Sequence, residues 1–88
     1  MKIHFTKSFK KAYLSRIQTS ENLIRIFDEV YDLFFENPSD PVLKDHQLSG
    51  RLQRYRAFSV TGEIRVMYHI HNNTAYFMDI GTHNQVYR

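Results

Sequence analysis

The feature that most constrains the fold is a long apolar stripe in the first half of the chain. Its members recur at spacings of three and four residues: Leu23, Ile24, Phe27, Val30, Tyr31 and Phe34. This period predicts an amphipathic helix, capped at its start by Thr19 or Ser20 and ending at Pro38, because proline cannot continue a helix. A stripe of this length must pack against another apolar surface.

A second, shorter helix is expected just before it. Apolar residues at helical spacing predict a helix over residues 7–17, and the hydroxyl of Thr6 is placed to cap it. Residues 2–5, KIHF, alternate polar and apolar side chains, which is typical of a short strand. The two helices with their short link predict a helical hairpin.

The surface that covers the hairpin is expected from the second half of the chain. Segments 51–60, 63–71 and 74–80 are rich in β-branched and aromatic residues and are separated by Thr61-Gly62 and Asn72-Asn73, plausible tight turns. They predict a three-stranded antiparallel meander. With residues 2–5 it gives an α+β fold: a four-stranded sheet with both helices on one face, as a single domain over residues 1–88.

Composition narrows the class of protein. A chain of 88 residues is too short for two cores, and 42% hydrophobic residues argue against disorder. The absence of cysteine excludes a disulfide framework and a thiolate metal site, which favours a reducing cytoplasm. No apolar run has the length of a membrane span. We therefore expect a soluble cytoplasmic protein that does not contact the membrane.

Charge is distributed in blocks. Residues 1–20 carry five Lys or Arg and no acid, residues 21–40 carry six acids and only Arg25, and cations return between Lys44 and Arg65. A fold that gathers the first and third blocks on one side would have a basic face and an acidic back. Nucleic acid and an acidic protein are the obvious partners of such a face.

The five histidines are not equally good candidates for a functional site. His4 fits a structural or surface role. His69 and His71 share one face of a strand, but no spaced set of ligands completes a metal site, so we expect neither metal nor cofactor. His46, in the loop 38–50, and His83, in the final segment, lie on no apolar stripe and are candidates for a site.

Arginines add to these candidates. Arg54 and Arg56 should share one face of the strand 51–60, and Arg65 lies on the middle strand of the meander. The position of Arg65 on a central strand is explained by anion binding or by a salt bridge with Glu63. Two histidines and a fixed guanidinium are suited to metal-free RNA cleavage, in which one group deprotonates the 2′-hydroxyl, another protonates the leaving 5′-oxygen and arginine stabilises the phosphorane. Tyr87 could stack on a base. On pattern alone this is one hypothesis among several.

The order of elements, with KDHQLSGRLQRYR, the RVMY strand and the tail DIGTHNQVYR, resembles the RelE/ParE superfamily of type II toxins. The nearest branch is the YafQ-type and plasmid-stabilisation mRNA interferases. The resemblance implies a RelE-like fold and a ribonuclease that cuts messenger RNA in the ribosomal A site and is silenced by a cognate antitoxin.

The same resemblance assigns roles to residues. His46 matches the loop histidine, His83 the tail histidine that is a candidate general acid, and Arg65 the strand arginine on the scissile phosphate. Glu63 lies where several members have a carboxylate, and Tyr87 where they place an aromatic near the substrate base. The cations expected on phosphate or ribosomal RNA are Lys44, Arg54 and Arg56.

The chain also departs from the family pattern. Ala57 and Ser59 stand where many YafQ-type toxins have an aspartate and a second histidine, so the general base falls to His46 or Glu63. Asp79 stands where many relatives have a basic residue. Two alternatives remain open: a ParE-type inhibitor of DNA gyrase without catalysis, and an inactive module that only binds antitoxin.

Overall fold

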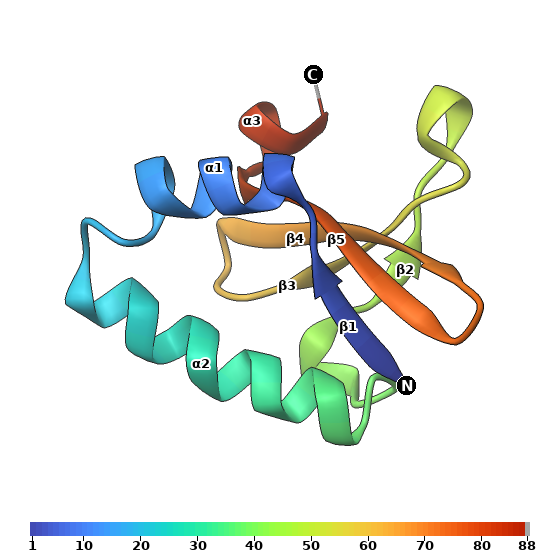
Figure 1. Cartoon of the computed structure of the whole chain (residues 1–88), viewed down its shortest axis with the longest axis horizontal. Helices are drawn as coiled ribbons and strands as arrows, with labels where there is room; N and C mark the ends of the chain where they lie inside the picture. Colours follow the sequence, from blue (N-terminus) through green and yellow to red (C-terminus); the bar gives the residue numbers. More distant parts are fainter. Residues whose placement is uncertain (88) are drawn as a thin grey trace.

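One mixed sheet forms the centre of the protein, with two helices on one face (Figure 1). The structure, a computed structural model, describes residues 1–87. The strands are β1 (Lys2–Phe5), β2 (His46–Gln47), β3 (Arg56–Ser59), β4 (Ile64–His71) and β5 (Thr74–Thr82). The helices are α1 (Lys7–Arg16), α2 (Glu21–Glu36) and α3 (His83–Tyr87), with 3-10 turns at Pro41–Leu43 and Gly50–Leu52.

The strand order is β1-β5-β4-β3-β2. The antiparallel meander β3-β4-β5 confirms the expectation, and β1 joins it parallel to β5. Asn72 and Asn73 form the tight turn between β4 and β5, both with positive φ. The predicted count of four strands was one too few, because His46 and Gln47 of the loop pair with β3 and extend the sheet.

Both helix starts confirm the expected caps. The hydroxyl of Thr6 accepts a hydrogen bond from the backbone N–H of Phe9, and that of Ser20 accepts one from Leu23. Thr6 also donates to the carbonyl oxygen of Phe77, at 2.7 Å, which ties the start of α1 to β5. The two helices run in opposite senses as a hairpin across the sheet (Figure 1).

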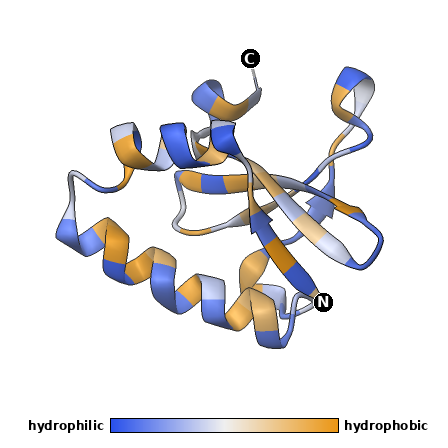
Figure 2. Ribbon diagram, viewed as in Figure 1, coloured by the Kyte–Doolittle hydropathy of each residue, from blue (hydrophilic) through white to orange (hydrophobic). Residues whose placement is uncertain are grey.

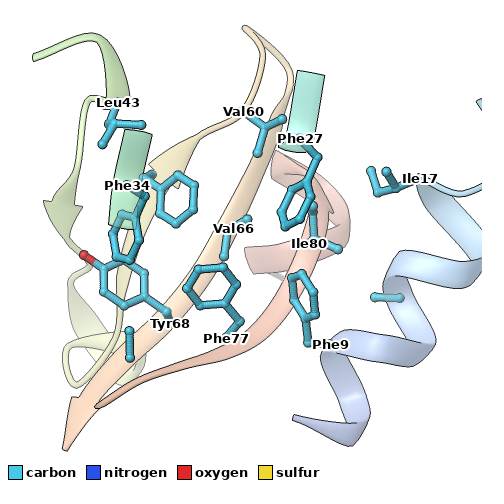
Figure 3. Packing of buried hydrophobic residues seen from close by; sticks show 13 residues of the cluster. Phe9, Ile17, Phe27, Phe34, Leu43, Val60, Val66, Tyr68, Phe77 and Ile80 are labelled. Carbon is cyan, nitrogen blue, oxygen red and sulfur yellow. The ribbon is translucent and has the colours of Figure 1, made fainter. Parts of the chain in front are cut away.

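An aromatic cluster fills the space between the helices and the sheet. Phe77 of β5 is fully buried and lies with its ring 5.5 Å from that of Phe9 in α1 and 5.6 Å from that of Phe34 in α2 (Figure 3). Hydrophobic and hydrophilic residues alternate along α2, so only one side of that helix faces this cluster (Figure 2). The apolar stripe is therefore covered as expected.

Strand alternation separates this core from the other side of the sheet. Val66 and Tyr68 of β4 are buried under the helices, so Arg65, Met67 and His69 between and beside them face the opposite side. We call this opposite side of the sheet the open face. Residues there carry the candidate site.

Two expected details of the sheet were wrong. Only residues 56–59 of the segment 51–60 form a strand, because Gly50 takes a positive φ of 65° and starts a 3-10 turn. The last strand was expected over residues 74–80. Instead β5 continues to Thr82 and is followed by the helix α3, which was not predicted.

The fold does not fully separate the basic and acidic blocks of the sequence into a basic face and an acidic back. Lys10 of α1 and Asp28 of α2 line the same groove between the two helices, so a cation of the first block lies beside an acid of the second. Of the first block, Lys2 lies on the open face, because its neighbour Ile3 packs into the core.

No helix within residues 1–87 has the length and apolar character needed to cross a membrane.

Candidate functional site

Arg65, His83 and Tyr87 meet where the C-terminal helix folds over the open face. The guanidinium carbon of Arg65 lies 5.8 Å from the ring centroid of Tyr87, within the range of a cation–π contact. The rings of His83 and Tyr87 pack edge to face with centroids 4.6 Å apart, as expected for residues four apart on a helix. Three residues expected at the site are thus brought together.

Local hydrogen bonds explain why α3 forms here. The hydroxyl of Thr82 accepts from the backbone N–H of Gln85, and the Gln85 side-chain oxygen accepts from the backbone N–H of Thr82 at 2.8 Å. This reciprocal pair is a capping box, and the spacing Thr-x-x-Gln was the sequence signal that could have predicted the helix. Gly81 favours this capping box, because a Cβ there would lie 2.6 Å from the Gln85 side-chain oxygen and would displace it.

Glu63 belongs to the same site. A shallow hollow on the surface is lined by Gly62, Glu63, Arg65, Thr82, His83 and Asn84. Glu63 follows the turn between β3 and β4, and its backbone N–H donates to the Thr61 hydroxyl, which fixes the turn. A carboxylate, an imidazole and a guanidinium therefore border one hollow.

The Arg65 side chain has hydrogen-bonding capacity left over. Its Nη2 donates a long bond of 3.5 Å to the carbonyl oxygen of Gly62. Its Nε is buried and has no acceptor among residues 1–87, and the buried hydroxyl of Tyr87 likewise has no partner there. Buried donors are nearly always satisfied in folded proteins, so these two atoms identify a place where a ligand could bond.

His46 shares the open face but lies apart from this hollow. It pairs with Ala57 of β3, which pairs with Met67 of β4, so His46 is two strands away from β4, about 10 Å. Its ring is exposed, and Nδ1 lies 3.0 Å from the carbonyl oxygen of Lys44. The expected pairing of His46 with His83 is thus not direct.

A partly buried polar network holds the loop that carries His46. The Tyr68 hydroxyl donates to one oxygen of the Asp45 carboxylate, and Nε of Arg56 donates to the other at 3.1 Å. Burial first, and then the bond to Asp45, raises the pKa of the Tyr68 hydroxyl above its ordinary value. In Figure 3 the Tyr68 hydroxyl points out of the aromatic cluster, as this bond requires.

The cations expected on phosphate are therefore dispersed. Arg56 lies opposite Tyr68 in the register, on the helix-covered face, and is ion-paired with Asp45. Arg54 precedes β3, so the expectation that it shares a strand face with Arg56 was wrong. Lys44 is exposed, with a positive φ of 50°, next to Asp45 in the same loop. None of the three lines the hollow shared by Arg65, Glu63 and His83, although Lys44 and Arg65 line another pocket together.

A row of rings across the open face was not predicted from sequence. His4 and Tyr76 pack edge to face at 5.5 Å, Tyr76 and His69 stack at 5.2 Å with planes 16° apart, and His69 meets Tyr55 at 5.9 Å. The guanidinium of Arg54 lies 5.8 Å from the Tyr55 ring centroid and ends the row. Taken singly in the sequence, each of these residues looks like an ordinary surface residue. Only the register between the strands brings them into one row. We call this set the ring row.

The ring row affects the protonation of its central imidazole. Burial, and then the positive charges of Arg54 and His71, lower the pKa of His69 below its ordinary 6.5. Both effects favour the neutral form of the His69 ring.

Asp79 does not leave a free negative charge beside the site. Arg16 of α1 donates from one nitrogen to the Asp79 carboxylate at 3.1 Å and to the carbonyl oxygen of Ile80 at 3.0 Å. Both side chains of the pair are about one quarter exposed, at 24%. A cation from the neighbouring helix thus neutralises the acid. Across residues 1–87, no three side chains of the types that ligate metals gather into a cluster.

The comparisons with known proteins agree with this fold. The family model described as the bacterial toxin of type II toxin–antitoxin system, YafQ, matches residues 1–88. No curated protein sequence matches the chain. Among solved structures, a mutant of YafQ from E. coli superposes with a TM-score of 0.82 at 22% identity, covering 98% of this chain and 97% of that one.

Two further structures have the same fold. The E. coli DinJ–YafQ complex gives a TM-score of 0.79 at 22% identity, over 98% of this chain and 97% of that one. A YoeB/ParE toxin from Agrobacterium tumefaciens gives 0.75 at 18% identity, over 94% of this chain and 99% of that one. These likenesses confirm the RelE-like α+β architecture.

The first prediction concerns the network around Asp45. Tyr68→Phe removes the hydroxyl that donates to a largely buried carboxylate, so the free energy of unfolding should fall by about 1–3 kcal/mol. Urea unfolding measures the change. Tyr76→Phe, on the open face, is the matched control and should change stability by less than about 0.5 kcal/mol. Equal effects of the two variants would contradict the role given to the network.

The second prediction concerns His69. Its pKa, followed by NMR titration of the ring, should lie below 6.5, and Arg54→Gln should raise it only part of the way, because burial is the larger cause. Arg51→Gln, which removes a charge from the same loop, should leave it unchanged. Because the folded chain binds this proton less readily than the unfolded chain, the contribution of His69 to stability falls as the pH drops through 6.5.

Proposed function

The chain belongs to the YafQ family of toxins of bacterial type II toxin–antitoxin systems, and on that premise we propose that it is a metal-independent endoribonuclease that cuts messenger RNA. The observation that carries the proposal is the hollow where Arg65, His83 and Glu63 meet, with a buried Arg65 nitrogen that lacks an acceptor among residues 1–87. A phosphate oxygen is the kind of acceptor that a guanidinium binds best.

Arg65, His83 and Glu63 are the types of side chain that transfer the protons and stabilise the charge when RNA is cleaved by attack of its own 2′-hydroxyl. A base removes the hydroxyl proton, the oxygen attacks the adjacent phosphorus, and the bond to the 5′-oxygen breaks as an acid supplies a proton. Arg65, held between Tyr87 and Gly62, stabilises the phosphorane. His83 on α3 is the general acid.

The geometry favours Glu63 over His46 as the general base. Glu63 borders the hollow with Arg65 and His83, whereas His46 lies about 10 Å from β4. His46 then contacts the RNA farther along the open face. Tyr87 packs against His83 and, with His83, Asn84 and Gln85, lines a second hollow on α3. We propose that its ring stacks on the base beside the scissile phosphate.

A cognate antitoxin is the expected protein partner. A solved complex of the same fold pairs E. coli YafQ with DinJ. We expect the partner of this chain to be acidic and partly disordered before binding, since the chain carries a net charge of +3. We place the cleavage on translated messenger RNA in the ribosomal A site, in contact with ribosomal RNA and in the cytoplasm, as the family resemblance implies.

The third prediction tests the reaction. His83→Ala or Arg65→Ala should slow cleavage of translated messenger RNA by about a hundredfold to ten-thousandfold, because each removes a group that acts on the transition state. Mapping the 5′ ends of transcripts after induction measures it, and thermal unfolding shows that the variants fold. Growth arrest with relaxed DNA and no codon-phased cuts would instead support gyrase inhibition. Tight antitoxin binding without growth arrest would indicate an inactive module.

The fourth prediction separates the two candidate bases. Glu63→Gln keeps the size of the side chain but removes its basicity, so it should lower the cleavage rate by more than about tenfold and abolish the acidic limb of the pH–rate profile. His46→Ala should cost less than about tenfold and leave that limb in place. The reverse ranking would assign the base to His46.

A further inference from the structure

The ring row has the features of a surface for unpaired bases. Its four rings come from three strands and the segment before β3, and they cross the sheet from His4 through Tyr76 and His69 to Tyr55. Three of them are half-buried and His4 is exposed, so part of each ring is open to solvent. A core packing role would have buried these rings, as it buries Phe77.

Charge around the ring row favours an anionic ligand. Arg54 lies over Tyr55 at one end, and Lys2, two residues from His4 on β1, lies on the same face at the other. His71 adjoins the row on β4. The one carboxylate among the neighbouring strand positions on β4 and β5, Asp79, is ion-paired with Arg16. The local positive potential also accounts for part of the lowered pKa of His69.

The row is continuous with the hollow that we assign to cleavage. His69 and Arg65 are on the same face of β4, four residues apart, which is about 13 Å along the strand. A single strand whose phosphate binds at Arg65 can therefore lay its neighbouring nucleotides across Met67 and onto the rings. Duplex RNA would not present free base faces to these rings.

We propose that the ring row of His4, Tyr76, His69 and Tyr55, ended by Arg54, is a stacking platform that binds single-stranded RNA next to the cleavage hollow. The inference rests on the proposed function only in taking RNA as the substrate. Rings supply stacking that every base can use, and the flanking cations bind the backbone. The platform gives affinity and register and takes no part in bond breaking.

Direct binding tests the platform separately from cleavage. A fluorescently labelled, unstructured RNA of about ten nucleotides is titrated with protein that carries His83→Ala throughout, so that the RNA stays intact. Adding Tyr76→Ala should raise Kd about fivefold or more, because one stacking surface is lost. Tyr76→Phe keeps the ring and should stay within about twofold. Phe35→Ala removes an exposed aromatic from α2 and is the matched control.

Each outcome of these measurements supports or overturns the proposed platform. The platform is supported if Tyr76→Ala and His69→Ala each bind the RNA more weakly while Tyr76→Phe and Phe35→Ala bind it unchanged. The protein should also bind duplex RNA less tightly than single-stranded RNA. An unchanged Kd for Tyr76→Ala, or no measurable RNA binding by protein with the intact row, overturns it. Weakened antitoxin binding with RNA affinity unchanged would make the row a protein interface and also overturns the proposal. If the His83→Ala protein binds RNA but does not cleave it, the stacking platform is still supported, because that result concerns only the cleavage reaction.

Discussion

The packing of Phe77 is the interaction on which the rest of the structure depends. Its ring contacts aromatic rings from three other strands and both long helices: Phe5, Phe9, Tyr31, Phe34, Phe58 and Tyr68. Because successive side chains of a strand point to opposite faces, burying Phe77 forces its neighbour Tyr76 onto the open face. The core contact and the ring row are therefore two consequences of one strand register.

The same coupling positions the hollow around Arg65 that we propose for cleavage. Val66 and Tyr68 of β4 are held in the core, which turns Arg65 outward, and the Tyr68 hydroxyl in turn holds Asp45 next to His46. A change at Tyr68 thus reaches both the helix-covered core and the loop at the sheet edge. A small domain has few elements, so each strand must serve the core with one side and the site with the other.

Much of the geometry of the candidate site was predictable, because its residues follow from strand periodicity and from the family resemblance. Arg65, His83 and Tyr87 do meet, and Glu63 borders the same hollow. The expectation that Arg54 and Arg56 share a strand face was wrong for a physical reason. The residues before β3 form a 3-10 turn, and Asp45 offers the Arg56 guanidinium a partner on the helix-covered face. Local periodicity carries no information about such a partner, which comes from another part of the chain.

Sequence by itself determined the elements with strong local causes. The apolar period of α2, the caps Thr6 and Ser20 and the Asn72-Asn73 turn are each encoded within a few neighbouring residues. Only the tertiary structure decided which histidines lie near which rings, that Arg16 neutralises Asp79, and that α3 folds back over Arg65. Those outcomes depend on the register between strands and on contacts between distant segments, and a one-residue slip in register would move every ring to the other face.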